Sequence, residues 1–172
     1  MNQPLSTETT ANASSAPSAI IWADPARAQA FTAWLASVAG AHGLNPASVK
    51  LASADASFRR YFRVDCSKAD QAGSCIIMDA PPDKEDCKPF VKVAGLMAQA
   101  GLSAPRVLAW DEPTGFMLLS DLGAQTMMEV IAPPAAVDAI AMPTAAHHDL
   151  YTQATDALVR WQLASKPGVL PP

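Results

Sequence analysis

The stretch DASFRRYFRV, residues Asp55–Val64, decides how the rest of the chain is understood. It holds three arginines and three aromatic residues within ten positions of a chain that is acidic overall. Aromatic residues at this density favour a β-strand. On residue type alone, two readings stay open. The segment is either a solvated hairpin with cross-strand partners for its arginines, or a surface that binds an anion.

The composition excludes several classes of protein. The 172 residues allow one domain, or one and a half small ones, and half of them are apolar. A formal net charge of −4 argues against a general nucleic-acid binder. No apolar run approaches the roughly 18 residues that span a bilayer, so we expect no membrane insertion. Residues 1–19 resemble no secretory signal and are too polar to fold, so we predict a disordered tail.

Three cysteines without metal-type spacing predict reduced thiols in a cytoplasmic protein. Cys66 and Cys75 flank a predicted turn and could instead face each other across a hairpin.

Structure is expected to begin with an amphipathic helix. Asp24 is a suitable N-cap, Pro25 suits the first helical position, and Gly43 can end the helix. The apolar residues that repeat at helical spacing are Phe31, Trp34, Leu35 and Val38.

Two hairpins with a helix between them follow. The polar break SKADQAG (67–73) lies between two strand-like runs. These are VKLASADASFRRYFRVDC (49–66) and SCIIMDAPP (74–82). Residues 87–97, CKPFVKVAGLM, predict a helix, and the runs RVLAW and FMLL flank the turn DEPTG (111–115). We therefore predict an α+β fold, a mainly antiparallel sheet with a helix packed on it. After Gly123 an Ala/Pro-rich linker leads to one more helix, over residues 149–165.

Four motifs in this order carry a family resemblance: DASFRRYFRV, IIMDAPP, CKPFVKVAGLM and GFMLLSDLGAQTM. They resemble the aminoglycoside-phosphotransferase-like sugar kinases. Within that family they are most similar to the anomeric kinases that phosphorylate N-acetylmuramate and N-acetylglucosamine in cell-wall recycling. The resemblance runs from about Leu51 to Gln125 and continues more weakly to Trp161. It implies a protein-kinase-like N-lobe over residues 20–119, a hinge over 120–124, and the start of a helical, incomplete C-lobe over 125–172.

The resemblance implies an ATP site between the first hairpin and the hinge. Protein kinases cover the phosphates with a glycine-rich loop, whereas this chain has no glycine there. Ser57, Arg59 and Arg60 are then the expected phosphate ligands, because guanidinium groups match phosphate oxygens in pairs. Neighbouring residues in a strand face opposite ways, so only one of the two arginines should reach the nucleotide directly.

The hinge would supply backbone groups to adenine. Ser120, Asp121, Leu122 and Gly123 are expected to provide them, with Leu119, Leu122 and Ile77 as apolar walls. Without the resemblance, the same residues read as a turn capped by Asp121.

The strand lysine of protein kinases is missing, and Met78 and Asp79 stand in its place. The residue that replaces it stays open. Asp79 is a candidate for a structural role, in an ion pair with Arg59 or Arg60. Glu85 and Asp86 are expected to be helix-start residues without a catalytic part.

The groups that perform phosphoryl transfer are not found in the sequence. No His-x-Asp followed by Asn occurs, and the run HHD (147–149) is expected to begin a helix instead of binding a metal. We expect the catalytic Asp and the Mg²⁺ ligands beyond residue 172, in a C-lobe that also binds the amino sugar. The chain alone should be inactive. The alternative is a non-catalytic nucleotide-binding or interaction domain with the shape of a kinase N-lobe.

Overall fold

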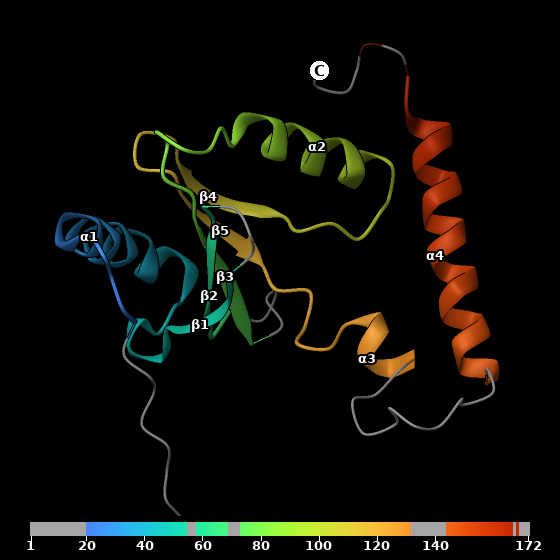
Figure 1. The fold of residues 1–172 in the computed structure, drawn as a ribbon, viewed down its shortest axis with the longest axis horizontal. Helices are drawn as coiled ribbons and strands as arrows, with labels where there is room; N and C mark the ends of the chain where they lie inside the picture. Colours follow the sequence, from blue (N-terminus) through green and yellow to red (C-terminus); the bar gives the residue numbers. More distant parts are fainter. Residues whose placement is uncertain (1–19, 55–57, 69–72, 132–143, 167, 169–172) are drawn as a thin grey trace, which may run out of the picture.

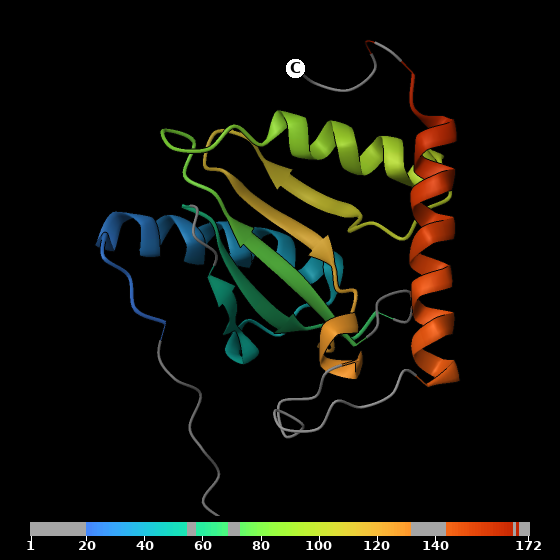
Figure 2. The ribbon, with the colours of Figure 1, turned by 45° about the vertical axis from the view of Figure 1, so that its right-hand side comes forward.

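The computed structural model describes residues 20–54, 58–68, 73–131, 144–166 and 168. The predicted disordered tail (1–19) and Ser57 lie outside these residues. Within them, five strands form one sheet in the order β1-β2-β3-β5-β4, and every neighbouring pair is antiparallel (Figure 2). The strands are β1 (Lys50–Ala54), β2 (Arg60–Asp65), β3 (Ser74–Asp79), β4 (Val107–Asp111) and β5 (Phe116–Ser120).

The two predicted hairpins are confirmed as β2–β3 and β4–β5. The tight β4–β5 turn needs a glycine, because Gly115 has φ +74° and its position leaves no room for a Cβ beside the Ala80 carbonyl. The sequence analysis treated the residues up to Cys66 as one strand, but the structure has a separate strand, β1, before β2. The chain turns back between β1 and β2, and Lys50 pairs with Arg63 while Ala54 pairs with Arg60.

The first helix, α1 (Pro25–His42), has the predicted ends. The Asp24 side chain accepts a hydrogen bond from the Ala26 N–H at 2.8 Å, and Gly43 ends the helix with φ 64°. The side chains of Phe31, Trp34 and Leu35 are buried against one face of the sheet. The α1-side core therefore follows from the predicted amphipathic pattern.

The opposite face of the sheet is covered by α2 (Lys88–Gln99). Figure 1 shows the sheet nearly edge-on between the two helices. The α1 side buries Phe62, Val64 and Ile77, whereas the α2 side buries Met78, Met117 and Leu119. Because side chains alternate along a strand, each position of β2 and β3 belongs to one of these two faces. This alternation decides which residues can border a site on either face.

Two further helices follow the sheet: α3 (Met127–Ile131) and α4 (Ala145–Ala164). Thr144 and His147 form a capping box at the start of α4, as expected for a helix start at HHD. α4 stands beside the end of α2 (Figure 1), and Arg160 donates a hydrogen bond to the carbonyl of Gly101 in the turn that follows α2. Four of its apolar side chains are exposed: Tyr151, Leu158, Val159 and Leu163. No helix in the described residues is long and apolar enough to cross a membrane.

Candidate functional site

A cleft of about 420 Å³ lies on the α2 side of the sheet, at the end of β5. Tyr61, Ile76 and Leu119 place it on this face, because they pack with the α2-side core. The segment that follows β5 forms its border. The lining residues are Ala52, Ser53, Tyr61, Arg63, Ile76, Phe90, Pro105 and Leu119 to Thr126.

The carboxylate of Asp121 is the centre of a hydrogen-bond network at this border. Oδ2 accepts from Arg63 Nε and from the Ser74 hydroxyl, both at 2.6 Å. Oδ1 accepts from Arg63 Nη2 at 3.1 Å and from the Gly123 N–H at 2.9 Å. The same Arg63 nitrogen donates to the Gly123 carbonyl at 3.0 Å. The segment after β5 is thereby bound to β2 and β3 through side chains.

The network keeps Asp121 ionised although its side chain is only 4% exposed. Burial acts to raise the pKa of its carboxyl, but the hydrogen bonds from Arg63, Ser74 and Gly123 outweigh burial and lower the pKa. The bond to Asp121 in turn raises the pKa of Arg63. The pair is therefore fully charged at neutral pH.

The backbone groups at the end of β5 and just after it differ in their hydrogen bonding. The Ser120 N–H donates to the Arg106 carbonyl, and the Ser120 hydroxyl accepts from the Arg106 N–H, both at 2.9 Å. The amide N–H of Leu122 has no partner among the residues that the structure describes. Leu122 lines the cleft and its side chain is exposed, whereas Leu119 is buried behind it. A flat ligand with a ring acceptor can thus be bound here between apolar groups.

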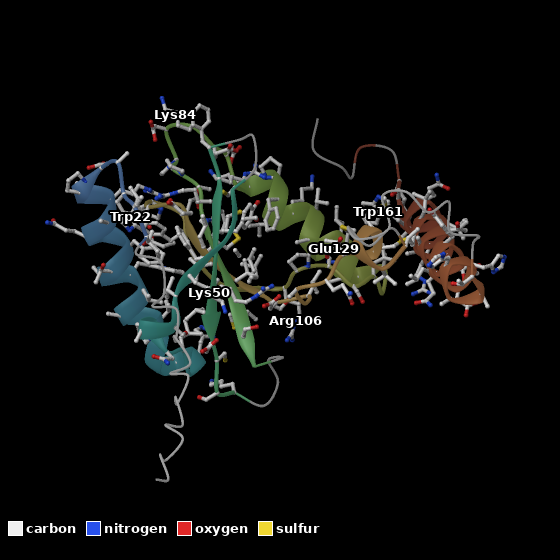
Figure 3. All side chains as sticks on the ribbon, turned by 60° about the horizontal axis from the view of Figure 1, so that its bottom comes forward. Trp22, Lys50, Lys84, Arg106, Glu129 and Trp161 are labelled. Atoms are coloured by element: carbon white, nitrogen blue, oxygen red, sulfur yellow. The ribbon has the colours of Figure 1, made fainter. Side chains whose placement is uncertain are left out.

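Two residues predicted for the site lie on the other face of the sheet. Arg60 donates to Asp79 Oδ2 at 3.1 and 2.6 Å, and its guanidinium stacks on Trp22, 4.1 Å from the ring centroid. Figure 3 shows Trp22 between α1 and the sheet. Ile77 is fully buried in the α1-side core. Neither lines the cleft, because Arg60 shares the parity of Phe62 in β2 and Ile77 shares that of Asp79 in β3.

Arg59 lies at the entry to β2 and pairs with Glu85. Its Nη2 is 2.9 Å from Glu85 Oε2, and the other oxygen of Glu85 accepts from the Phe58 N–H at 3.3 Å. Burial acts to lower the pKa of Arg59, but the charge of Glu85 and the hydrogen bonds to Tyr61 and Glu85 together outweigh it, so the pKa is raised. Glu85 therefore bonds to the entry of β2. Asp86 lies at the start of α2, where its carboxylate accepts from the Lys88 N–H and Cys87 is the N-cap residue.

Several cleft residues were missed in the sequence analysis, among them Tyr61, Arg63 and Ile76. The signal that could have found Tyr61 and Arg63 is the alternation in β2. Phe62 and Val64 are apolar and mark the core-facing positions, so Tyr61 and Arg63 must face the other way. Asp79 is paired with Arg60, one of the two partners that the sequence left open, and also with Arg27.

Comparison with known proteins gives the family. The sequence profile described as APH, the phosphotransferase enzyme family, matches residues 48–171. The chain belongs to this phosphotransferase family. The five-stranded antiparallel sheet with its helices is accordingly the kinase-like N-lobe predicted for an α+β fold, and the family resemblance is confirmed.

Curated relatives of this APH chain are N-acetylmuramate/N-acetylglucosamine kinases. The protein from Pseudomonas aeruginosa is 46% identical over 157 residues, which cover 86% of this chain and 41% of the relative. The Pseudomonas putida protein is 40% identical, over 72% of this chain and 32% of its own length. The Neisseria meningitidis protein is 39% identical, over 70% and 32%. The chain thus spans at most about two fifths of the length of these relatives.

Proposed function

We propose that this chain is the nucleotide-binding part of an ATP-dependent sugar kinase. The reaction would transfer the terminal phosphoryl group of ATP to the anomeric hydroxyl of N-acetylmuramate or N-acetylglucosamine, in cytoplasmic cell-wall recycling. The observation that carries the proposal is the cleft bordered by the backbone of residues 120–123, in a chain 46% identical to a kinase of that name. The substrate is inferred from the relatives' names, because the described residues include no acceptor site that we can assign.

The adenine ring would occupy the cleft. In this proposal residues 120–124 are the hinge, and the Leu122 N–H donates to a ring nitrogen of adenine. Leu119, Leu122 and Ile76 provide apolar contacts on either side of the ring. Ile76 takes the part that the sequence analysis gave to Ile77, since only Ile76 lines the cleft.

The phosphates would extend toward the connection between β1 and β2. Arg59 is the proposed cation for them, because it lies where β2 begins, beside the cleft residue Tyr61. Glu85 holds its guanidinium from the α2 side. Ser57 stays a proposed phosphate ligand outside the described residues. Arg60 is not proposed, since both of its bonds to Asp79 lie on the α1 side.

The catalytic base and the Mg²⁺ ligands would come from the part of the relatives that this chain does not cover. Among the described residues no three His, Cys, Asp or Glu side chains gather into a group that could hold a metal. Magnesium would neutralise charge on the phosphates. In this proposal residues 125–172 begin the helical C-lobe, and the chain alone does not turn over substrate.

Nucleotide binding by the purified chain tests the proposal. ATP, ADP and adenosine should each raise the melting temperature, by an amount that grows with ligand concentration relative to its Kd. Arg59→Ala should weaken ATP binding about tenfold, the size of one lost charge-assisted hydrogen bond, and leave adenosine unaffected. Lys88→Ala, which removes another cation at an exposed ion pair, is the matched control.

Two results would contradict the proposal. One is the absence of any stabilisation by millimolar ATP or adenosine. The other is sustained turnover of N-acetylmuramate and ATP by this chain alone in a coupled assay, which would place the catalytic groups within residues 1–172.

A further inference from the structure

The segment after β5 is held in place by side chains from two other strands. A free hinge would be held only at its ends, but here Asp121 receives Arg63 from β2 and Ser74 from the start of β3. Arg63 also reaches past Asp121 to the Gly123 carbonyl. These bonds connect the nucleotide-facing hairpin directly to the proposed hinge.

Asp121 has little capacity left for a ligand. Its two oxygens already accept four hydrogen bonds, and its side chain is almost fully buried. A carboxylate in such a position acts by orienting its neighbours. The neighbour whose backbone it orients is Gly123, with φ +108°, a conformation that side-chain-bearing residues rarely adopt. Leu122 lies between the two, so the direction of its unpartnered N–H depends on both.

We propose that Arg63 and Asp121 are positioning residues that preset the backbone of residues 121–123 for the base of the nucleotide. The proposal rests on the proposed function and refines it. The pair contributes affinity for the base end of the ligand and none for its phosphate end. The phosphate end depends instead on Arg59, which belongs to a separate ion pair with Glu85.

The geometry separates this role from a merely structural one. Ser74 donates a neutral hydrogen bond to the same carboxylate. Arg63 forms an ion pair with Asp121 and also donates a hydrogen bond to the Gly123 carbonyl. If the pair only held the fold together, its loss would lower the melting temperature and leave the affinity of the folded protein for adenosine unchanged. If it positions the hinge, the affinity for adenosine falls as well.

Binding of probes for the two ends of ATP by the 172-residue chain tests the proposal. Adenosine reports on the base end, 1-deazaadenosine lacks the ring acceptor at N1, and tripolyphosphate reports on the phosphate end. In Asp121→Asn and Arg63→Lys we expect the Kd for adenosine to rise about tenfold. The Kd for tripolyphosphate should not change, and the preference for adenosine over 1-deazaadenosine should shrink.

A double variant and a matched control complete the design. Because the two residues act as a unit, Arg63→Lys combined with Asp121→Asn should cost no more adenosine affinity than either change alone. Glu112→Gln, in the exposed pair with Lys88, should leave all three probes unaffected. If Asp121→Asn fails to fold, Arg63→Lys with Ser74→Ala gives the same comparison while keeping the carboxylate.

The outcomes separate the two proposals. If the unmodified chain binds adenosine and the variants bind it equally well, or lose adenosine and tripolyphosphate affinity to the same extent, the positioning role is overturned and the proposed function stands. If the unmodified chain binds neither adenosine nor ATP, the proposed function itself is overturned.

Discussion

Two aspartates with little-exposed carboxylates, Asp79 and Asp121, are each held by arginines, but they lie on different sides of the sheet. Asp79 faces α1 and is 1% exposed. It accepts from Arg27 and from Arg60. Asp121 borders the cleft and accepts from Arg63, Ser74 and Gly123. The same pairing of carboxylate and guanidinium thus occurs twice, and only its location decides whether it can influence a ligand.

The surroundings of the two aspartates explain the difference further. The arginines on Asp79 also stack on rings: Arg27 lies 4.3 Å from the Phe116 centroid and Arg60 lies 4.1 Å from that of Trp22. Arg60 donates as well to the carbonyl of Ile21, which ties the segment before α1 to the sheet. Among the described residues no aromatic ring stacks on Arg63, and Asp121 connects the sheet to the segment after β5 instead. We therefore expect Asp79 to act on folding and Asp121 to act on both folding and binding.

The largest effect is expected for Asp79→Ala. Removing the carboxylate leaves two guanidinium groups close together and without their partner in a partly buried site. Breaking a buried pair in this way costs about 3–5 kcal/mol of unfolding free energy. Urea denaturation at neutral pH measures it. A loss below about 1 kcal/mol would contradict the role given to Asp79, and so would a changed affinity of the folded variant for adenosine.

A smaller effect, with a characteristic pH dependence, is expected for Asp121→Asn. The loss should be about 1.5–3 kcal/mol at neutral pH, the range for hydrogen bonds to a charged group. Because the folded-state pKa of Asp121 is lowered, its contribution is complete above the unfolded pKa of about 3.9. It disappears as the pH falls through the lower folded-state value.

Urea titrations of the unmodified chain and Asp121→Asn across pH 2–7 check this expectation. The difference between their unfolding free energies should stay constant down to about pH 4 and shrink below it. A difference that has already vanished at pH 6 would show that the carboxylate is not held in its ionised form by these bonds.

The smallest effect is expected for Lys88→Ala. Lys88 and Glu112 form an ion pair at 2.9 Å, but both side chains are more than half exposed. Water screens such pairs and ordering the side chains opposes them, so no change in urea midpoint should be measurable. A clear destabilisation would mean that this exposed ion pair stabilises the fold as the ion pairs of Asp79 and Asp121 do.

Much of the fold could be predicted from local patterns. Asp24, Pro25 and Gly43 marked the ends of α1, and the turn DEPTG marked the β4–β5 hairpin. These signals succeed because a helix cap or a tight turn depends on residues only a few positions apart. The family, too, was recognisable, since four short motifs occur in their order along the chain.

The nucleotide site itself stays a prediction, and the structure shows only the geometry of its expected residues. A cleft lies beside the segment after Leu119, whereas Arg60 and Ile77 face α1 and Glu85 bonds to Arg59. The prediction missed Arg63 and its bond to Asp121, which joins residues 58 positions apart. No local pattern reports a contact over that separation.

The sequence by itself determined where most helices and strands begin and end, and to which family the chain belongs. Only the tertiary structure decided which face of the sheet each residue of β3 and β5 occupies. Helices cover both faces, so β3 and β5 read as unbroken apolar runs in which alternation carries no sign of inside or outside. The side on which α1 packs resolves that ambiguity, and it assigns one aspartate to the core and leaves the other at the cleft.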